Sequence, residues 1–373
     1  MTPVIHCRLC LSKVEMKLAL TPTPIANAFT EEASGGMCMK YPLDLCECPS
    51  CGHVQLGLSI SGDTLFQNYK YRTPEVERIR LAEYAAKLAQ RFPFALGTSS
   101  GRGTDRPKVI EIGSNNGLFV NELRTAGFFA VGIDPSGPQT GMPRWFNSKT
   151  AKNIAYSLGK MKMILANNVF AHVDDLRNIF VGIDRVLDDD GVVIFEVQYF
   201  PKMVDLGAFD MVYHEHKSYH TLKPLPRFLA KFGMCMFDYE HLDTHGGSIR
   251  VYCKRGSDGI KVPDEVIDWA LFKSRIDDEK ERINKSLTGR VAAFGATAKA
   301  TTLIHHFGLQ DKISYCVDET PEKKGLFVPG TNIRIVGVDA LESQPPDMML
   351  LTAWNYADYI RSRFNIPMVV PFH

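Results

Sequence analysis

The sequence has no long hydrophobic run, almost no net charge and no export signal, and each absence narrows its function. No apolar stretch approaches the about 20 residues that cross a bilayer as a helix, which predicts no membrane span. The 43 Lys and Arg residues nearly balance 42 Asp and Glu, so nothing favours general attraction to nucleic acid or to an anionic membrane. The first residues lack the basic-then-apolar pattern of a signal peptide. We therefore predict a cytoplasmic protein that binds neither nucleic acid nor membrane.

A disulfide framework is also disfavoured, because the nine cysteines are odd in number and no export signal accompanies them. Four of them form two Cys-x-x-Cys pairs, Cys7/Cys10 and Cys48/Cys51. Each pair offers two thiolates from one tight turn, and four thiolates fill a tetrahedral zinc shell with no open position. Cys46 lies nearby but lacks this spacing. The pattern predicts a structural zinc site, with four free thiols as the alternative.

The rest of the chain alternates apolar strands with helical patterns, which is typical of parallel, doubly wound sheets. Strands are predicted at 108–112, 130–134, 163–167 and 192–196, and then at 290–294, 313–318 and 348–352. Helical patterns occupy 66–94, 118–126 and the charged stretch 264–286. We therefore divide the chain into a zinc-binding module (1–65), a helical segment with a linker (66–104), a doubly wound domain (105–255) and a smaller C-terminal α/β domain (256–373).

A ligand-binding turn follows the first strand of the doubly wound domain. Glu111 lies in that strand, and Gly113 and Gly117 follow in a turn that opens a helix. Glycines allow close backbone approach, and a helix N-terminus offers unpaired N–H groups. The second strand ends at Asp134, whose carboxylate can accept hydrogen bonds from ribose hydroxyls. The turn is not Gly-x-Gly-x-x-Gly, which argues against a nicotinamide dinucleotide. A plain α/β turn without a ligand is the other alternative.

Several motifs, taken in order, indicate a family. They are Cys48–Leu56, Phe66–Thr73, Glu111–Gly117, Ala166–His172, Phe209–His216, His245–Arg250, Gly295–Lys299 and Ala353–Ala357. Over essentially its full length the chain resembles the three-domain C-methyltransferases of deoxysugar pathways, such as those of mycarose, tetronitrose or noviose biosynthesis. It departs from the usual pattern at Asn115, where ordinary methyltransferases often have glycine, and at Asn116, where this family commonly has an acid.

The resemblance implies a fold, a reaction and two cofactors. The fold is a class I methyltransferase Rossmann-like doubly wound sheet, with an N-terminal zinc-binding module and a C-terminal Rossmann-like α/β domain. The reaction is S-adenosylmethionine-dependent C-methylation of a nucleotide-diphosphate-linked keto-deoxy sugar. Zinc is the second, structural cofactor. The residues expected to bind S-adenosylmethionine are Glu111, Gly113, Asn115, Gly117, Asp134, Asn167 and Tyr71.

Carbon methylation requires a carbon nucleophile, which a base can generate by removing a proton next to a ketone. Histidine suits this role, and His216 is the first choice. Tyr213 and Glu215 lie in the same segment and could orient the ring or donate to the enolate oxygen. In a regular strand His216 would face away from both, so the three can converge only in a turn. His172 follows the strand 163–167 and is the supporting or alternative base.

The C-terminal domain is expected to hold the nucleotide diphosphate. Lys299 follows a helix-opening turn suited to phosphate, and Lys323 is expected at the same edge. Trp354 and Asn355 follow a strand and could face the sugar, as could His245 beside its two glycines. The alternative is a scaffold domain with a packed Trp354.

Other functions stay open at the sequence level. The histidine-rich segment could bind a metal through His214, Glu215, His216 and His220, although its spacing fits no common pattern. The enzyme could instead be an O- or N-methyltransferase, which needs no base that forms an enolate. A non-enzymatic zinc-ribbon binding protein on a methyltransferase fold is the third alternative, and the absence of a basic stripe argues against nucleic acid as its partner.

Overall fold

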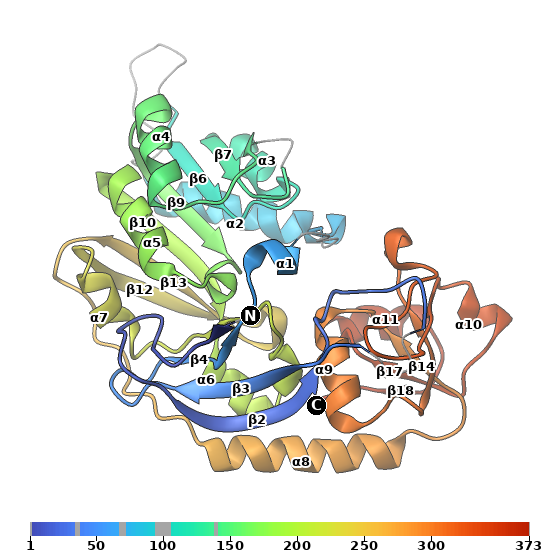
Figure 1. Cartoon of the computed structure of the whole chain (residues 1–373). Helices are drawn as coiled ribbons and strands as arrows, with labels where there is room; N and C mark the ends of the chain where they lie inside the picture. The colour runs from blue at the N-terminus through green and yellow to red at the C-terminus, as the bar shows by residue number, and fades with distance from the viewer. Residues whose placement is uncertain (1, 34–37, 67–71, 94–105, 138–140, 373) are drawn as a thin grey trace.

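The computed structural model describes residues 2–33, 38–66, 72–93, 106–137 and 141–372, which form three main sheets (Figure 1). The largest sheet has seven strands; a four-stranded sheet is built mainly from N-terminal residues, and a five-stranded sheet is built from C-terminal residues. Within these ranges, no helix is long and apolar enough to cross a membrane.

The seven-stranded sheet has the strand order β12-β13-β10-β9-β6-β7-β8. Neighbouring strands run parallel, except that β13 is antiparallel to both β10 and β12. This order, with one reversed strand, is the doubly wound arrangement expected from the resemblance. The strands are β6 (Lys108–Ile112), β7 (Phe129–Ile133), β8 (Gly141–Met142), β9 (Met161–Asn167), β10 (Leu187–Gln198), β12 (Met234–Leu242) and β13 (Ser248–Arg255).

Helices cover both faces of this sheet, which explains why its inner strands are apolar at consecutive positions. Val109 packs with α2 (Arg78–Arg91) and α3 (Leu118–Thr125) on one face. The next residue, Ile110, packs with α4 (Ser148–Leu158) and α5 (Leu176–Val186) on the other. Successive side chains of a strand point to opposite faces, so each strand contributes to two cores.

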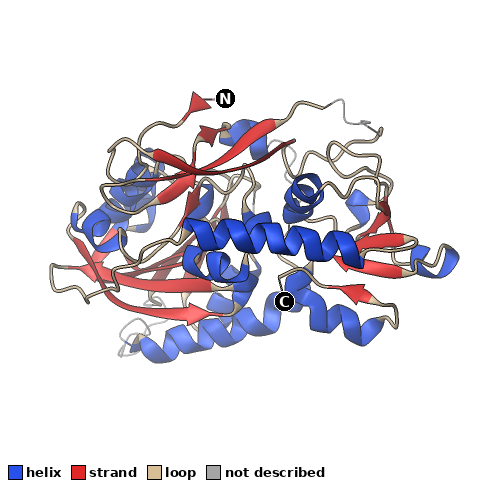
Figure 2. Cartoon of the chain, turned by 90° about the horizontal axis from the view of Figure 1, so that it is seen from below, coloured by secondary structure: helices blue, strands red, loops and turns tan. Residues whose placement is uncertain are grey.

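The C-terminal sheet is wholly parallel and has the order β16-β15-β14-β17-β18. Its strands are β14 (Val291–Phe294), β15 (Ile313–Val317), β16 (Ile335–Val336), β17 (Met348–Leu351) and β18 (Met368–Val369), and its helices are α9 (Ala298–Phe307), α10 (Ala340–Ser343) and α11 (Ala357–Arg363). The long helix α8 (Trp269–Ser286) crosses the underside of the molecule on its way to this domain (Figures 1 and 2). Its buried residues share one continuous core with both the N-terminal and the C-terminal sheets.

The N-terminal sheet has the order β11-β4-β3-β2, and its fourth strand comes from far along the chain. Strands β2 (Glu15–Thr23), β3 (Tyr41–Glu47) and β4 (Val54–Leu56) belong to the N-terminal region, whereas β11 is Ser218–Tyr219. A two-stranded ribbon of β1 (Thr2–Pro3) and β5 (Leu58–Ser59) completes this part. The pairing of β11 with β4 joins the segment that follows Phe209–His216 directly to the N-terminal sheet.

The predicted strands are confirmed to within three residues at their starts or ends, apart from the longer β10. The helical pattern at 66–94 corresponds chiefly to α2. The predicted start of the charged helix near residue 264 is wrong, because α8 begins at Trp269. The Asp268 side chain accepts a hydrogen bond from the Leu271 N–H and so caps the helix at this point. The predicted linker falls mainly on 94–105, outside the described residues.

Candidate active site and metal centre

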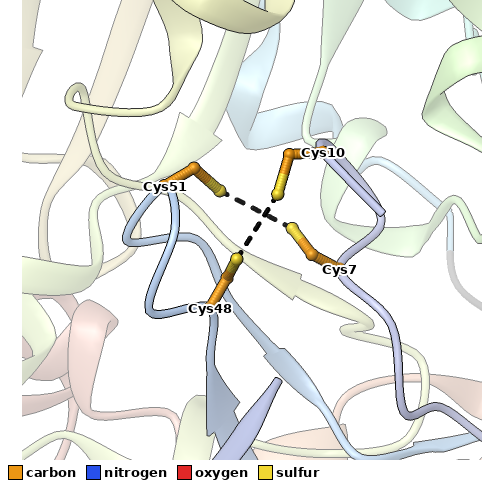
Figure 3. A group of neighbouring side chains, drawn as sticks. All are labelled: Cys7, Cys10, Cys48 and Cys51. Atoms are coloured by element: carbon orange, nitrogen blue, oxygen red, sulfur yellow. Dashed lines mark hydrogen bonds between the residues drawn. The ribbon is translucent and has the colours of Figure 1, made fainter. Parts of the chain in front are cut away.

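The four predicted zinc ligands converge (Figure 3). The Sγ atoms of Cys7 and Cys51 are 3.6 Å apart, those of Cys10 and Cys48 are 3.4 Å apart, and all four lie within 4.8 Å of one another. A zinc–sulfur distance of about 2.3 Å in a tetrahedron requires about 3.8 Å between sulfurs, so small shifts of the side chains suffice for the cluster to hold zinc. Gly52 follows the second pair at φ 77°, a left-handed conformation that favours glycine.

The cysteine cluster is packed into a hydrophobic core. Three of its cysteines are buried, together with Leu9, in the core that contains Phe228 of α7 (Leu225–Ala230). Lys231, which follows α7, donates to the Leu9 carbonyl and so adds a hydrogen bond between α7 and the first cysteine turn. In the part of the chain that the structure describes, no other group of His, Cys, Asp or Glu is arranged to hold a metal. The metal alternative for the segment 214–220 therefore gains no support.

The predicted cofactor turn is strongly curved. Gly113, Asn115 and Gly117 have φ values of 72°, 48° and 78°. Asparagine is one of the few residues besides glycine that tolerates this region, which accounts for Asn115 where glycine is common. The Asn115 N–H donates to Asp134 Oδ2 at 2.9 Å. A Cβ atom added to Gly113 would lie 2.3 Å from a methyl group of Val169, so the loop after β9 packs directly on this turn.

Buried polar atoms without protein partners lie at the ends of β6 and β9. Glu111 Oε2 and both amide atoms of Asn167 are buried and have no hydrogen-bond partner among the described residues. Burial raises the pKa of Glu111 to about 8, and nearby Asp134 adds to this shift. Because buried polar groups are normally paired, these atoms indicate a polar ligand at this edge of the sheet. The carboxyl groups of Glu111 and Asp134 fit the cationic methionine end and the ribose of S-adenosylmethionine.

A segment before α2 also contacts the cofactor turn, a contact that the sequence did not reveal. The Thr73 N–H donates to Asn115 Oδ1 at 3.2 Å, and the Asn116 side-chain amide donates to the Thr73 carbonyl at 3.0 Å. Asn116, which replaces the acid of the family pattern, therefore has a structural partner. Tyr71 lies outside the described residues, and its cofactor contact stays a prediction.

A turn brings Tyr213 and His216 together, the geometry that their convergence was predicted to need. The His216 N–H donates to the Tyr213 carbonyl at 2.9 Å, and the Tyr213 hydroxyl lies 2.8 Å from His216 Nε2. His216 Nδ1 lies 2.9 Å from the Met211 carbonyl oxygen. A carbonyl can only accept, so Nδ1 carries the hydrogen and Nε2 is the basic atom, which accepts from the tyrosine.

His172 lies beside this pair. Its ring centroid is 4.8 Å from that of His216, and the planes are inclined by 64°. His172 Nδ1 donates to the Glu215 carbonyl oxygen at 2.9 Å, which again makes Nε2 the basic atom. Burial lowers the pKa of His172 to about 4. Burial, with His172 alongside, also holds the pKa of His216 well below its ordinary value. Both rings are therefore neutral at pH 7 and can accept a proton.

The Glu215 side chain has a different partner from the one that the sequence suggested. Its carboxyl Oε1 accepts from the Asn27 amide at 2.9 Å, while its backbone carbonyl orients His172. The Glu215 side chain is buried, and Oε2 has no partner among the described residues. Burial raises the pKa of this carboxyl to about 7. Sequence reasoning missed Asn27, because it lies 188 positions away in the N-terminal module.

Three of the residues predicted to bind substrate gather on the C-terminal domain, next to the catalytic segment. Lys299 Nζ donates to Asn355 Oδ1 at 2.6 Å and lies 4.0 Å from the Trp354 ring centroid. The Trp354 indole donates to Asp210 Oδ2 at 2.7 Å. Burial lowers the pKa of Lys299 to about 8, an effect that Asp210 opposes, and burial raises the pKa of Asp210 to about 6. Near pH 7, Lys299 is therefore mainly positively charged and Asp210 mainly negatively charged.

His245 joins this group, whereas Lys323 is paired elsewhere. His245 has φ 55°, and a Cβ atom on the next residue, Gly246, would lie 2.4 Å from the Trp354 ring. The His245 loop therefore packs against the tryptophan. Lys323 Nζ instead lies 3.3 Å from Asp318 Oδ2 and donates to a backbone carbonyl of the turn before α9. Its charge is largely balanced within the protein.

Three family models match successive parts of the chain. They describe a zinc binding domain (residues 7–66), a methyltransferase domain (77–236) and a C-methyltransferase C-terminal domain (264–366). The C-methyltransferase NovU of Streptomyces niveus is 28% identical over 391 residues, covering 96% of this chain and 91% of NovU.

Solved methyltransferase structures are also similar to part of the chain. Magnesium protoporphyrin IX methyltransferase of Synechocystis is 14% identical, with a TM-score of 0.33 and coverage of 52% of this chain and 92% of that one. An S-adenosylmethionine-dependent methyltransferase of Clostridium acetobutylicum is 12% identical, with a TM-score of 0.34 and coverage of 52% and 96%.

Proposed function

We propose that this chain, which belongs to the S-adenosylmethionine-dependent C-methyltransferases with an N-terminal zinc-binding module, methylates a carbon of a nucleotide-diphosphate-linked keto-deoxy sugar. The observation that carries the proposal is the pair of neutral imidazoles, His172 and His216, beside the cofactor turn. The His172 N–H donates to the carbonyl of Val169, and Val169 contacts Gly113. The backbone of His172 is therefore joined through Val169 to the turn expected to hold the methyl donor.

His216 is the proposed base, and Tyr213 supports it. In the structure the Tyr213 hydroxyl donates to His216 Nε2. When a ketone enters, the hydroxyl is proposed to turn and donate to the carbonyl oxygen, which leaves Nε2 to take the proton from the neighbouring carbon. The electron pair of the broken C–H bond forms the enolate, and the tyrosine stabilises the developing oxyanion.

The low pKa of His216 is compatible with this step. Burial disfavours the imidazolium, but an enolate formed next to the ring supplies the opposite charge and offsets that cost. When bound, S-adenosylmethionine supplies the electrophilic methyl group that the enolate carbon attacks. Glu111, Asn167 and Asp134 are the proposed residues that hold it, since the first two carry buried unpaired atoms.

The C-terminal cluster is the proposed site for the nucleotide diphosphate. Lys299 supplies a positive charge, while Trp354 and Asn355 hold it in place. The hydrogen bond from Trp354 to Asp210 connects this cluster to the segment that carries Tyr213 and His216. A phosphate bound at Lys299 would therefore leave its sugar near the base. Lys323 is already paired with Asp318, so we propose that it contributes less than Lys299 to phosphate binding. Because substrate and cofactor are metabolites of the cell interior, we expect the enzyme to act in the cytoplasm.

The experiment that tests this function supplies S-adenosylmethionine with a ¹³C-labelled methyl group and a panel of thymidine-, guanosine- and cytidine-diphosphate keto sugars. NMR then locates the label. A new methyl group on a carbon next to the ketone is the expected product. Label found on oxygen or nitrogen would favour an O- or N-methyltransferase and would refute the enolate mechanism.

A further inference from the structure

A short stretch of the N-terminal module reaches the catalytic segment. It follows β2 and is held against the C-terminal domain by hydrogen bonds before and after Asn27. The Thr301 hydroxyl of α9 donates to the Ala26 carbonyl at 3.1 Å, and the Phe327 N–H donates to the Thr30 carbonyl at 2.8 Å. Asn27 lies between these points, and its amide donates to Glu215. The stretch is therefore fixed on both sides of Asn27, whose side chain contacts the catalytic segment.

The Glu215 carboxyl has one satisfied and one unsatisfied oxygen. Oε1 accepts from Asn27, whereas Oε2 is buried without a hydrogen-bond donor among the described residues. Glu215 is only 1% exposed, so solvent does not provide that donor. A buried acceptor left unpaired costs free energy, and such atoms commonly mark a place where a ligand completes the bonding. Deoxysugars carry hydroxyl groups, which are donors of the required kind.

We propose that Asn27 of the zinc-binding module is a positioning residue for methyl transfer, which fixes the Glu215 carboxyl so that Oε2 accepts a hydrogen bond from a hydroxyl of the sugar. This inference rests on the proposed function and extends it to the N-terminal module. The Glu215 backbone carbonyl orients the His172 ring, so the same residue links the sugar contact to the pair of imidazoles. The zinc-binding module then completes the reaction site and does more than stabilise the fold.

A double-mutant cycle separates this role from a merely structural one. The variants are Asn27→Ala, Glu215→Ala and the double variant. They are compared in single-turnover methyl transfer to the keto sugar that the wild-type protein accepts, at pH 8, where the Glu215 carboxyl with its pKa of about 7 is ionised. We expect Asn27→Ala alone to lower the rate about 10- to 100-fold, the range for a hydrogen bond to a charged group, with unchanged affinity for S-adenosylmethionine. In the Glu215→Ala background the same change should alter the rate less than about threefold.

Two controls accompany the cycle. Asn153→Ala removes an exposed asparagine from α4 and should leave the rate unchanged. Zinc content and the thermal midpoint are measured for each variant. If Asn27→Ala loses zinc, Asn27→Ser, whose hydroxyl is too short to span the contact, takes its place in the cycle. An equal rate loss in both backgrounds would overturn the inference while leaving the proposed function intact. A wild-type protein that binds S-adenosylmethionine but methylates no keto sugar would overturn both.

Discussion

Replacing Glu215 with glutamine should reveal a buried carboxyl that holds a proton near neutrality. Burial raises the pKa of Glu215 to about 7 in the folded protein, against an ordinary value of 4.5. Between pH 4.5 and about pH 7, the Glu215 carboxyl of the folded protein keeps a proton that the unfolded chain has released. The carboxyl therefore stabilises the fold fully below pH 4.5, and this stabilisation is lost as the pH rises through 7.

The size of the effect follows from the two pKa values. The step from 4.5 to about 7 corresponds to about 3 kcal/mol of unfolding free energy, of which about 2 to 3 kcal/mol changes between pH 5 and pH 8. Glutamine stays neutral and keeps an oxygen that can accept from Asn27. The buried histidines titrate in both proteins and cancel in the difference. Relative to wild type, Glu215→Gln should therefore gain about 2 to 3 kcal/mol on going from pH 5 to pH 8.

The assay is thermal unfolding of the zinc-loaded protein at pH 5, 6, 7 and 8. For a chain of this length the expected change in the difference between the two midpoints is about 3 to 4 °C. Glu32→Gln, at an exposed position, is the matched control for loss of a surface carboxyl. A midpoint difference for Glu215→Gln that stays constant from pH 5 to pH 8 would refute the placement of this carboxyl in a buried, desolvated site.

Three further changes address the metal and the two ligands. Cys48→Ser breaks the four-thiolate shell and should reduce bound zinc from one equivalent towards none and lower the thermal midpoint; elemental analysis that still finds one equivalent would contradict the site. Asn167→Ala removes buried atoms expected to contact S-adenosylmethionine and should weaken its binding about 10-fold by calorimetry, whereas unchanged affinity would remove this residue from the cofactor site. Lys299→Ala should raise KM for the nucleotide sugar at least about 10-fold without changing cofactor affinity, and an equal loss of both would indicate a structural role.

Much of the fold and part of the site could be predicted from local sequence. Strands β6 and β9 are short, mainly apolar runs that are buried on both faces. Each carries a polar residue near its C-terminal end, Glu111 in β6 and Asn167 in β9, at the edge of the sheet expected to bind the cofactor. The cysteine pairs specify two tight turns whose sulfurs must lie within about 4 Å of one another to share zinc. Strand geometry predicted that Tyr213, Glu215 and His216 could converge only in a turn or loop. The structure brings Tyr213 and His216 together in a turn, whereas the Glu215 side chain contacts Asn27.

The remaining contacts depend on how the modules pack, which local pattern does not encode. Asp210 meets Trp354 across 144 positions, and Asn27 meets Glu215 across 188. Strand β11 joins the N-terminal sheet through two residues, too few to show any alternation in the sequence. The early start predicted for α8 has a local cause, because charged residues before Asp268 extend the helical composition beyond the residue that caps the helix.

Deuterium exchange into the substrate tests the central claim most directly. Wild-type protein and His216→Asn are incubated in D₂O with the accepted keto sugar and S-adenosylhomocysteine, which carries no methyl group to transfer. If His216 removes the proton next to the ketone, the wild-type protein introduces deuterium at that carbon. His216→Asn should do so at least about 100-fold more slowly while binding the cofactor normally. Exchange by His216→Asn at the wild-type rate would contradict the account.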